Sequence, residues 1–227
     1  MKLSAVLLAR TLAFVDINEL NPRGAVFLPL LVPHLVERFS FQKFPSKPED
    51  FEEGKGVVFK DGYINGQTIE DFTVYSDGIK LDVRSSTSQG RTVLLETLEW
   101  LAAKHGISYR EGSISRWNYV SNLAFNTEVD LDIIAPAITA LTRRISLEMK
   151  DDRRVTDGFH VEALNIDVDR TFGAKQIAPF TLQRRAGIAY SEGKYFSAAP
   201  LPTDIHISII EEFEENVRKQ GWKHEGR

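Results

Sequence analysis

The acidic side chains of two adjacent strand-like segments are the residues of this chain best suited to chemistry. Glu70 and Asp71 lie on the first segment, and Asp82 lies on the second. Clustered carboxylates of this kind can hold Mg²⁺ or Mn²⁺ for metal-dependent hydrolysis. Nuclease sites of this class usually have a lysine two residues after an acidic residue, whereas this chain has Arg84 there. The alternation of Lys80, Asp82 and Arg84 equally indicates a solvated sheet face with cross-strand ion pairs, and we favour that interpretation.

The remaining catalytic residue types form no recognisable motif. None of the five histidines pairs with another at the i, i+4 spacing of helical zinc sites. The glycine-rich nucleotide-binding motifs and the Gly-x-Ser-x-Gly turn of serine hydrolases do not occur. Cysteine is absent, which excludes disulfides, thiolate metal sites and a cysteine nucleophile. We therefore expect no catalytic set, no metal and no cofactor, and we lean against an enzyme. Distant residues can still assemble an active site without a local motif.

Adjacent arginines are the main basic feature of the chain, and they all lie in its second half. They are Arg143, Arg144, Arg153, Arg154, Arg184 and Arg185. The same half contains the aromatic residues Trp117, Tyr119, Tyr190 and Tyr195. Basic groups interleaved with aromatics can hold a single nucleic-acid strand by stacking and phosphate contacts. The net charge of −4 gives no general attraction to nucleic acid, so this role is the second hypothesis.

Aromatic side chains at the edges of predicted elements could instead anchor a protein partner. Trp100 falls off the apolar stripe of its predicted helix, so it either packs against the sheet edge or anchors a partner. Phe41 and Phe44 follow a predicted helix, where they either fasten the loop to the core or form an exposed apolar patch. Our leading hypothesis is a non-enzymatic protein–protein interaction or scaffold subunit of a larger complex, with a protein partner or a second copy.

Hydrophobic periodicity and turn residues predict the elements that position these groups. The first half is expected to contain a strand at 3–16, a helix at 25–39, an exposed loop at 43–55, three strands within 56–84 and a helix at 91–105. The second half is expected to contain a strand at 115–126, a helix at 134–148, a loop at 151–158, strands at 160–169, 178–185 and 187–198, and a helix from 203. Each half therefore reads as β-α-β-β-β-α.

Short sequences from the first half return in the second half in the same order. Leu12-Ala13-Phe14 returns as Leu123-Ala124-Phe125, the leucine and arginine of 35–39 return in 141–145, and 69–73 returns as 177–181. The separations lie between 106 and 111 residues. We expect one α+β body made by internal duplication, with related halves at 1–113 and 114–227. Each half should have an antiparallel sheet with helices packed on one face.

The predicted element order resembles the saddle-shaped repeat of TATA-binding-protein-like folds. It is less closely similar to the paired β-α-β-β-β units of sliding DNA clamps. This resemblance is one of topology across the whole chain and rests on no sequence motif, so it bears on the fold and says little about function.

The composition is that of a folded globular protein, with 42% hydrophobic and 26% charged residues. Arg10 interrupts the apolar segment near the N-terminus, which we interpret as a buried strand rather than a signal peptide. No apolar run approaches 18 residues, so we predict no membrane span. The absence of cysteine suits a reducing compartment, and we expect a cytoplasmic protein.

Overall fold

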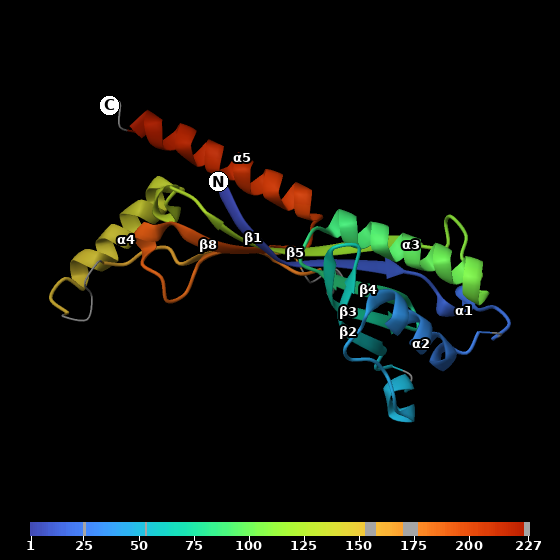
Figure 1. Cartoon of the computed structure of the whole chain (residues 1–227). Helices are drawn as coiled ribbons and strands as arrows, with labels where there is room; N and C mark the ends of the chain where they lie inside the picture. The colour runs from blue at the N-terminus through green and yellow to red at the C-terminus, as the bar shows by residue number, and fades with distance from the viewer. Residues whose placement is uncertain (25, 53, 153–157, 170–176, 225–227) are drawn as a thin grey trace. The chain divides into compact units, whose positions relative to one another are not determined.

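The computed structural model describes residues 1–24, 26–52, 54–152, 158–169 and 177–224, with side chains up to residue 219 (Figure 1). The first elements are β1 (Lys2–Phe14), α1 (Ile17–Leu20), α2 (Leu28–Phe39), β2 (Val57–Ile64), β3 (Gln67–Tyr75), β4 (Gly78–Val83) and α3 (Thr87–His105). They are followed by β5 (Arg116–Asn126), α4 (Pro136–Glu148), β6 (Ala163–Ile166), β7 (Phe180–Arg184), β8 (Lys194–Ala199) and α5 (Thr203–His224). Short 3₁₀ helices cover Pro48–Phe51, Leu131–Ile133 and Tyr190–Glu192.

The strands form an eight-stranded antiparallel sheet in the order β2-β3-β4-β1-β5-β8-β7-β6. An antiparallel sheet combined with α-helices confirms the predicted α+β class. Within the described ranges, no helix has both the length and the apolar character that crossing a membrane requires.

The chain divides into two compact units. The first, called the α3 unit, contains residues 6–121 and 200–203. The second, called the α5 unit, contains residues 1–5, 122–199 and 204–227. The long strands β1 and β5 supply residues to both units, so the division between the units falls within these two strands.

A hairpin with alternating side chains forms the middle of the α3 unit. Tyr75 pairs with Gly78 across the turn at Ser76 and Asp77 that joins β3 to β4. Ile79, Leu81 and Val83 are buried on one face, as the period-2 pattern requires. The structure therefore confirms β3 and β4 as two of the strands expected within 56–84 and pairs them as a hairpin.

Both longer helices of the α3 unit pack on that inward face. Ser86 caps α3 by accepting a hydrogen bond from the backbone N–H of Gln89 at 3.2 Å, and Gly106 ends the helix in the left-handed conformation. Pro29 lies in the first turn of α2, where its missing N–H breaks no hydrogen bond. The resulting core includes Leu31, Val32, Leu35, Phe39, Phe59, Phe72, Leu81, Val83, Leu94 and Leu98.

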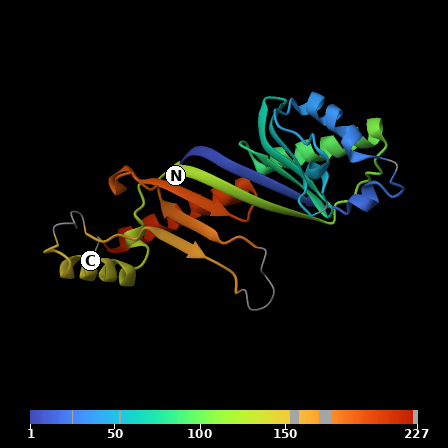
Figure 2. The same ribbon diagram turned by 90° about the horizontal axis from the view of Figure 1, so that it is seen from below.

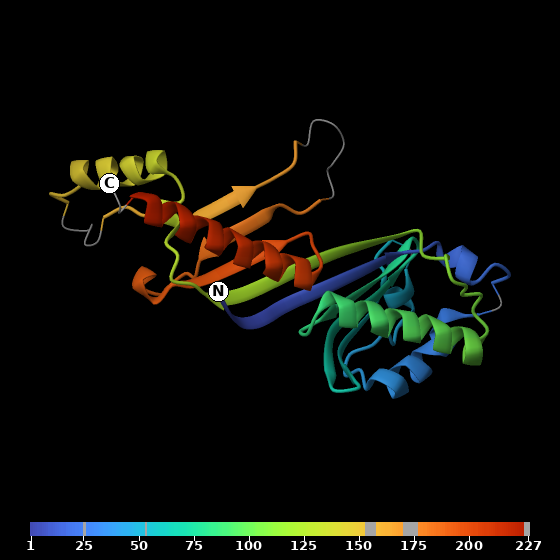
Figure 3. The same ribbon diagram turned by 90° about the horizontal axis from the view of Figure 1, so that it is seen from above.

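The α5 unit contains the short strands β6, β7 and β8 of the sheet, with α5 lying over the strands (Figures 2 and 3). Ile210 and Val217 of α5 are buried, as are Leu182 and Tyr195 of the strands. The strand expected at 160–169 is limited to β6, and the strand expected from 187 begins only at Lys194 because a 3₁₀ turn precedes it. The described strands of this unit are therefore shorter than the apolar pattern predicted.

Candidate interaction surface

The acidic residues that suggested metal chemistry are engaged with neighbouring cations. Arg10 donates from Nε and Nη2 to the two carboxylate oxygens of Asp82, at 2.8 and 2.7 Å. Lys80 lies 3.0 Å from Asp71, and Arg84 pairs with Glu70. This confirms the ion-pair interpretation, although Asp82 is only 4% exposed and its surroundings are not solvated as expected. No group of three or more histidine, aspartate or glutamate side chains among the described residues is placed to hold a metal ion.

A buried serine–histidine contact joins β8 to α5, and sequence reasoning did not find it. Ser197 Oγ lies 2.8 Å from His206 Nε2, and both residues are fully buried. Ser197 also donates its single hydroxyl hydrogen to the carbonyl oxygen of Thr181 at 2.7 Å. His206 Nε2 must therefore donate to the serine, whereas a nucleophile requires the histidine to accept. The contact is a polar link within the core.

Trp100 connects two helices instead of lying at the sheet edge. Its ring centre is 4.6 Å from the Arg38 guanidinium carbon of α2 and 4.7 Å from the ring centre of His105. His105 in turn lies 4.4 Å from His34, ring centre to ring centre. Cation–π and aromatic contacts of this kind stabilise the packing of α2 on α3. Trp100 is half-buried, so its binding role stays a prediction.

Because His105 of α3 contacts His34 of α2, we predict that the free energy of unfolding depends on pH. Burial, and secondly the charge of His34, lower the pKa of His105 below its ordinary value of 6.5. The folded state then disfavours the protonated ring. The contribution of His105 to the free energy of unfolding is therefore fully present above pH 6.5 and is lost as the pH falls from 6.5 through the lowered pKa. Urea midpoints at about pH 7.5 and about pH 5.5 should differ less in His105→Gln than in the wild type. His34→Gln should give an intermediate difference, and an unchanged difference in His105→Gln would refute the assignment.

The two phenylalanines after α2 occupy different environments. Phe41 is 3% exposed, and its ring centre lies 5.4 Å from Phe39 and 5.2 Å from Phe59. Phe41 therefore fastens the loop to the core, and it has no surface to offer a partner. Phe44 is 44% exposed and remains a candidate contact residue.

The arginine doublets also separate into different roles. Arg184 is 5% exposed, donates to Asp130 and to the carbonyl oxygen of Val161, and stacks on Tyr190 at 4.3 Å. This side chain is a structural element of the α5 unit, not a surface cation. Arg185 is exposed. Arg153 and Arg154 lie outside the described residues.

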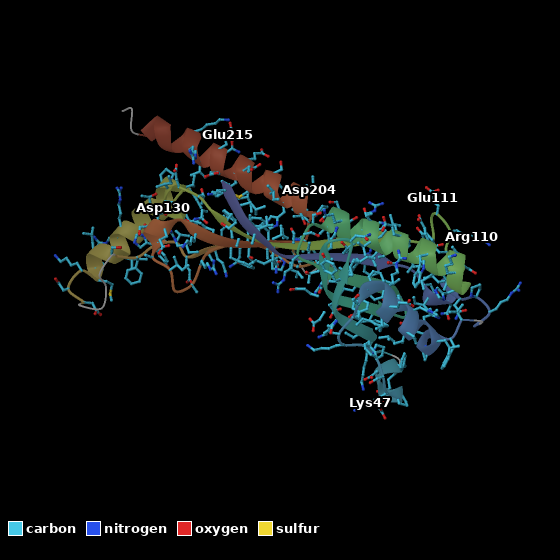
Figure 4. The ribbon with its side chains drawn as sticks, in the orientation of Figure 1. Lys47, Arg110, Glu111, Asp130, Asp204 and Glu215 are labelled. Atoms are coloured by element: carbon cyan, nitrogen blue, oxygen red, sulfur yellow. The ribbon has the colours of Figure 1, made fainter. Side chains whose placement is uncertain are left out.

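A surface pocket of about 650 Å³ lies beside α3 in the α3 unit, and its lining contains both basic and acidic side chains. Its lining includes Arg91, Glu99, Arg110, Glu111 and Trp117, and Figure 4 labels Arg110 and Glu111 in the segment after α3. The Arg91 guanidinium carbon lies 4.8 Å from the centre of the Trp117 ring. Since this arginine already stacks on that ring, the ring is not a free platform for a nucleic-acid base.

Helix α4 presents an apolar stripe to solvent. Ile138, Leu141 and Ile145 are 38%, 54% and 36% exposed, and no residue of the helix is buried. Their spacing of three and four residues places them on one side of the helix, as predicted. We call these three residues the α4 face. Leu141 corresponds in the internal repeat to Leu35, which is 1% exposed, so the two positions differ in burial.

One of the two basic residues of α4 flanks this apolar stripe. Arg143 and Arg144 are both exposed, and Arg144 forms an ion pair with Glu148. At about 100° per residue, Arg144 borders the α4 face, whereas Arg143 lies on the opposite side of the helix, one turn before Leu147. Arg144 is therefore the arginine of this doublet that lies next to a surface suited to protein contact.

The outward side of α5 combines exposed isoleucines with carboxylates. Ile205 and Ile209 are 50% and 39% exposed and lie one helical turn apart. The exposed carboxylates of Asp204, Glu211, Glu212 and Glu215 all lie to one side of these isoleucines around the helix, and Figure 4 labels Asp204 and Glu215. We call Ile205, Ile209 and these four carboxylates the α5 outer face.

No protein-family model matches this chain, and no curated protein sequence matches it.

Proposed function

We propose that this chain is a non-enzymatic interaction module, a scaffold subunit that associates through the α4 face. The observation that carries the proposal is that α4 has no buried residue while its apolar stripe is exposed. Contiguous apolar surface of this kind is typical of protein-binding sites in soluble proteins. A cytoplasmic setting and a larger complex belong to the same proposal.

The instability of an isolated helix supports a partner for α4. Helices shorter than about 12–15 residues are marginal in water without tertiary packing. Helix α4 has 13 residues. Thr139 fastens its start by donating to the carbonyl oxygen of Asp132, and Ser146 Oγ accepts from the backbone N–H of Phe159. These polar contacts position the helix but leave its apolar stripe uncovered. A partner would cover the stripe.

From charge complementarity we infer that the partner bound at the α4 face is a second copy of the chain. The α4 face is flanked by Arg144, whereas the α5 outer face combines exposed isoleucines with four carboxylates. An α4 face packed on the α5 outer face of another copy buries apolar side chains on both sides and places opposite charges at the rim. A twofold axis would form this contact twice and close the assembly as a dimer.

Leu141→Asp is expected to abolish self-association, because it introduces a charge at the centre of the α4 face. The matched control is Leu147→Asp, since Leu147 is 61% exposed and follows Ile138 by nine residues, which is two and a half helical turns. Sedimentation equilibrium should show a dimer for the wild type and Leu147→Asp and a monomer for Leu141→Asp.

Two results would overturn self-association. One is a monomeric wild type at a concentration on the order of 100 µM, where even weak dimers form. The other is equal dissociation by both aspartate variants, which would point to a general effect of charge on α4. A charge reversal, Arg144→Glu, should also weaken the dimer, and Glu212→Arg in the same chain should restore part of the loss.

We further propose that the two halves arose by internal duplication. Both halves contain β-α-β-β-β-α, apart from the additional α1 in the first. The neighbours in the sheet also correspond, since β2-β3-β4-β1 in the first half matches β6-β7-β8-β5 in the second. The correspondence supports the topological resemblance to TATA-binding-protein-like repeats. Helix α4 differs from its counterpart α2, because α2 has four buried residues and α4 has none.

The other two hypotheses receive less support from the geometry. Nucleic-acid binding relied on the arginine doublets, and Arg184 is buried in an ion pair. Metal-dependent hydrolysis relied on three carboxylates that each pair with a cation. Gel shifts at low salt and the effect of Mg²⁺ on thermal stability test these two alternatives.

A further inference from the structure

The α3 unit contains an apolar cavity of about 90 Å³ between its two longer helices. Its walls are formed by α2 and α3, and its floor by β3 and β4. The buried part of the lining includes Leu35, Phe72, Leu94 and Leu98, each no more than 2% exposed. The cavity lies among residues that the proposed self-association does not involve.

The two polar side chains in the lining, Thr97 and Asn21, are each hydrogen-bonded to the protein backbone. The hydroxyl of Thr97 donates to the carbonyl oxygen of Val93 at 2.6 Å. The Asn21 side chain both donates to and accepts from the backbone of Val26, at 2.7 and 3.1 Å. A bound water needs two to four polar partners, which this lining does not supply. The chemistry of the cavity therefore favours an apolar occupant.

One end of the cavity reaches the molecular surface. Ile17, Val26, Leu28 and Ile107 line that end and are only half-buried. Phe27 is adjacent to two of these residues and is 63% exposed. An apolar opening of this kind lets a hydrocarbon enter without desolvating a polar group.

We infer that this cavity is a binding site for an apolar ligand, either a small hydrocarbon or the hydrocarbon end of a longer molecule. The buried lining fixes the chemistry of the group that enters, and the half-buried end leaves room for a chain to continue toward solvent. Entry of the group adds dispersion contacts with side chains that face the cavity. This site is independent of the proposed interaction role.

Methyl NMR of the whole chain tests the inference with xenon and octanoate as probes. Xenon should shift the methyl signals of Leu94, Leu98 and Leu101 saturably. Thr97→Leu should remove these shifts, because its larger side chain occupies the cavity. Thr92→Leu is the matched control, since Thr92 lies on the same helix and also donates to a carbonyl oxygen four residues earlier, but is exposed. Its xenon shifts should match those of the wild type.

The octanoate titration distinguishes the two sources of the ligand. Octanoate that shifts the same methyls, with affinity at least about tenfold weaker in Thr97→Leu, identifies the end of a longer chain. Xenon binding without octanoate binding identifies a small hydrocarbon. Absence of saturable xenon shifts in the wild type, or their persistence in Thr97→Leu, would overturn the inference. If Thr97→Leu does not fold, Val74→Leu fills the same cavity and decides the question.

Discussion

Asp82→Ala is expected to lower the free energy of unfolding by about 2–3 kcal/mol. The substitution leaves the Arg10 guanidinium without the carboxylate that it contacts through two nitrogens. Breaking a fully buried ion pair typically lowers stability by about 3–5 kcal/mol. The Arg10 side chain is 35% exposed, so solvent screening reduces the effect here. Urea unfolding of the wild type and the variant measures the difference.

Glu70→Ala is the control for this prediction, because it removes a carboxylate from the same sheet at an exposed pair. The Arg84 side chain of that pair is 69% exposed, so the loss should stay below about 1 kcal/mol. Equal losses in the two variants would contradict the importance of the Arg10–Asp82 contact. The hydrolase hypothesis makes a different prediction for the wild type, since Mg²⁺ bound to the folded state would raise its melting temperature.

Local patterns were sufficient to predict the strands and the two longer helices of the α3 unit, but not the short helix α1. Alternation at Ile79, Leu81 and Val83 specifies an inward face because successive strand residues point to opposite sides. Ser86 and Gly106 supply the caps that limit α3. Each of these signals depends only on residues within a few positions of one another, so it can be recognised in the sequence without knowledge of the tertiary contacts.

The candidate surface could be predicted only in part, because burial depends on contacts distant in sequence. The pattern of Ile138, Leu141 and Ile145 predicted a helix correctly, but a stripe that packs on a core and one that stays exposed have the same periodicity. Arg184 looked like half of a surface doublet, yet Asp130, 54 residues earlier, draws it into the α5 unit. No local signal separates these cases.

Leu98→Ala is expected to lower the free energy of unfolding by about 3–5 kcal/mol, the largest effect predicted for this chain. Leu98 is 1% exposed and lines the cavity between α2 and α3. Its truncation removes buried methyl groups and enlarges a cavity that is already present, and both effects destabilise the folded state. Thermal and urea unfolding measure the loss, and Leu95→Ala on the same helix should lose less because Leu95 is only half-buried.

Benzene should return part of the stability lost in Leu98→Ala. An apolar cavity of about 150 Å³ accepts benzene in an engineered protein, and the wild-type cavity is about 90 Å³. Benzene should therefore raise the melting temperature of Leu98→Ala by more than that of the wild type or Leu95→Ala, since a ligand stabilises only the folded state that binds it. An equal benzene effect in all three proteins would show that the enlargement of the cavity does not contribute to binding. If benzene does not change the melting temperature of Leu98→Ala, the helices have closed over the truncated side chain. The loss in free energy of unfolding should then lie near the lower limit of the range for leucine-to-alanine substitutions.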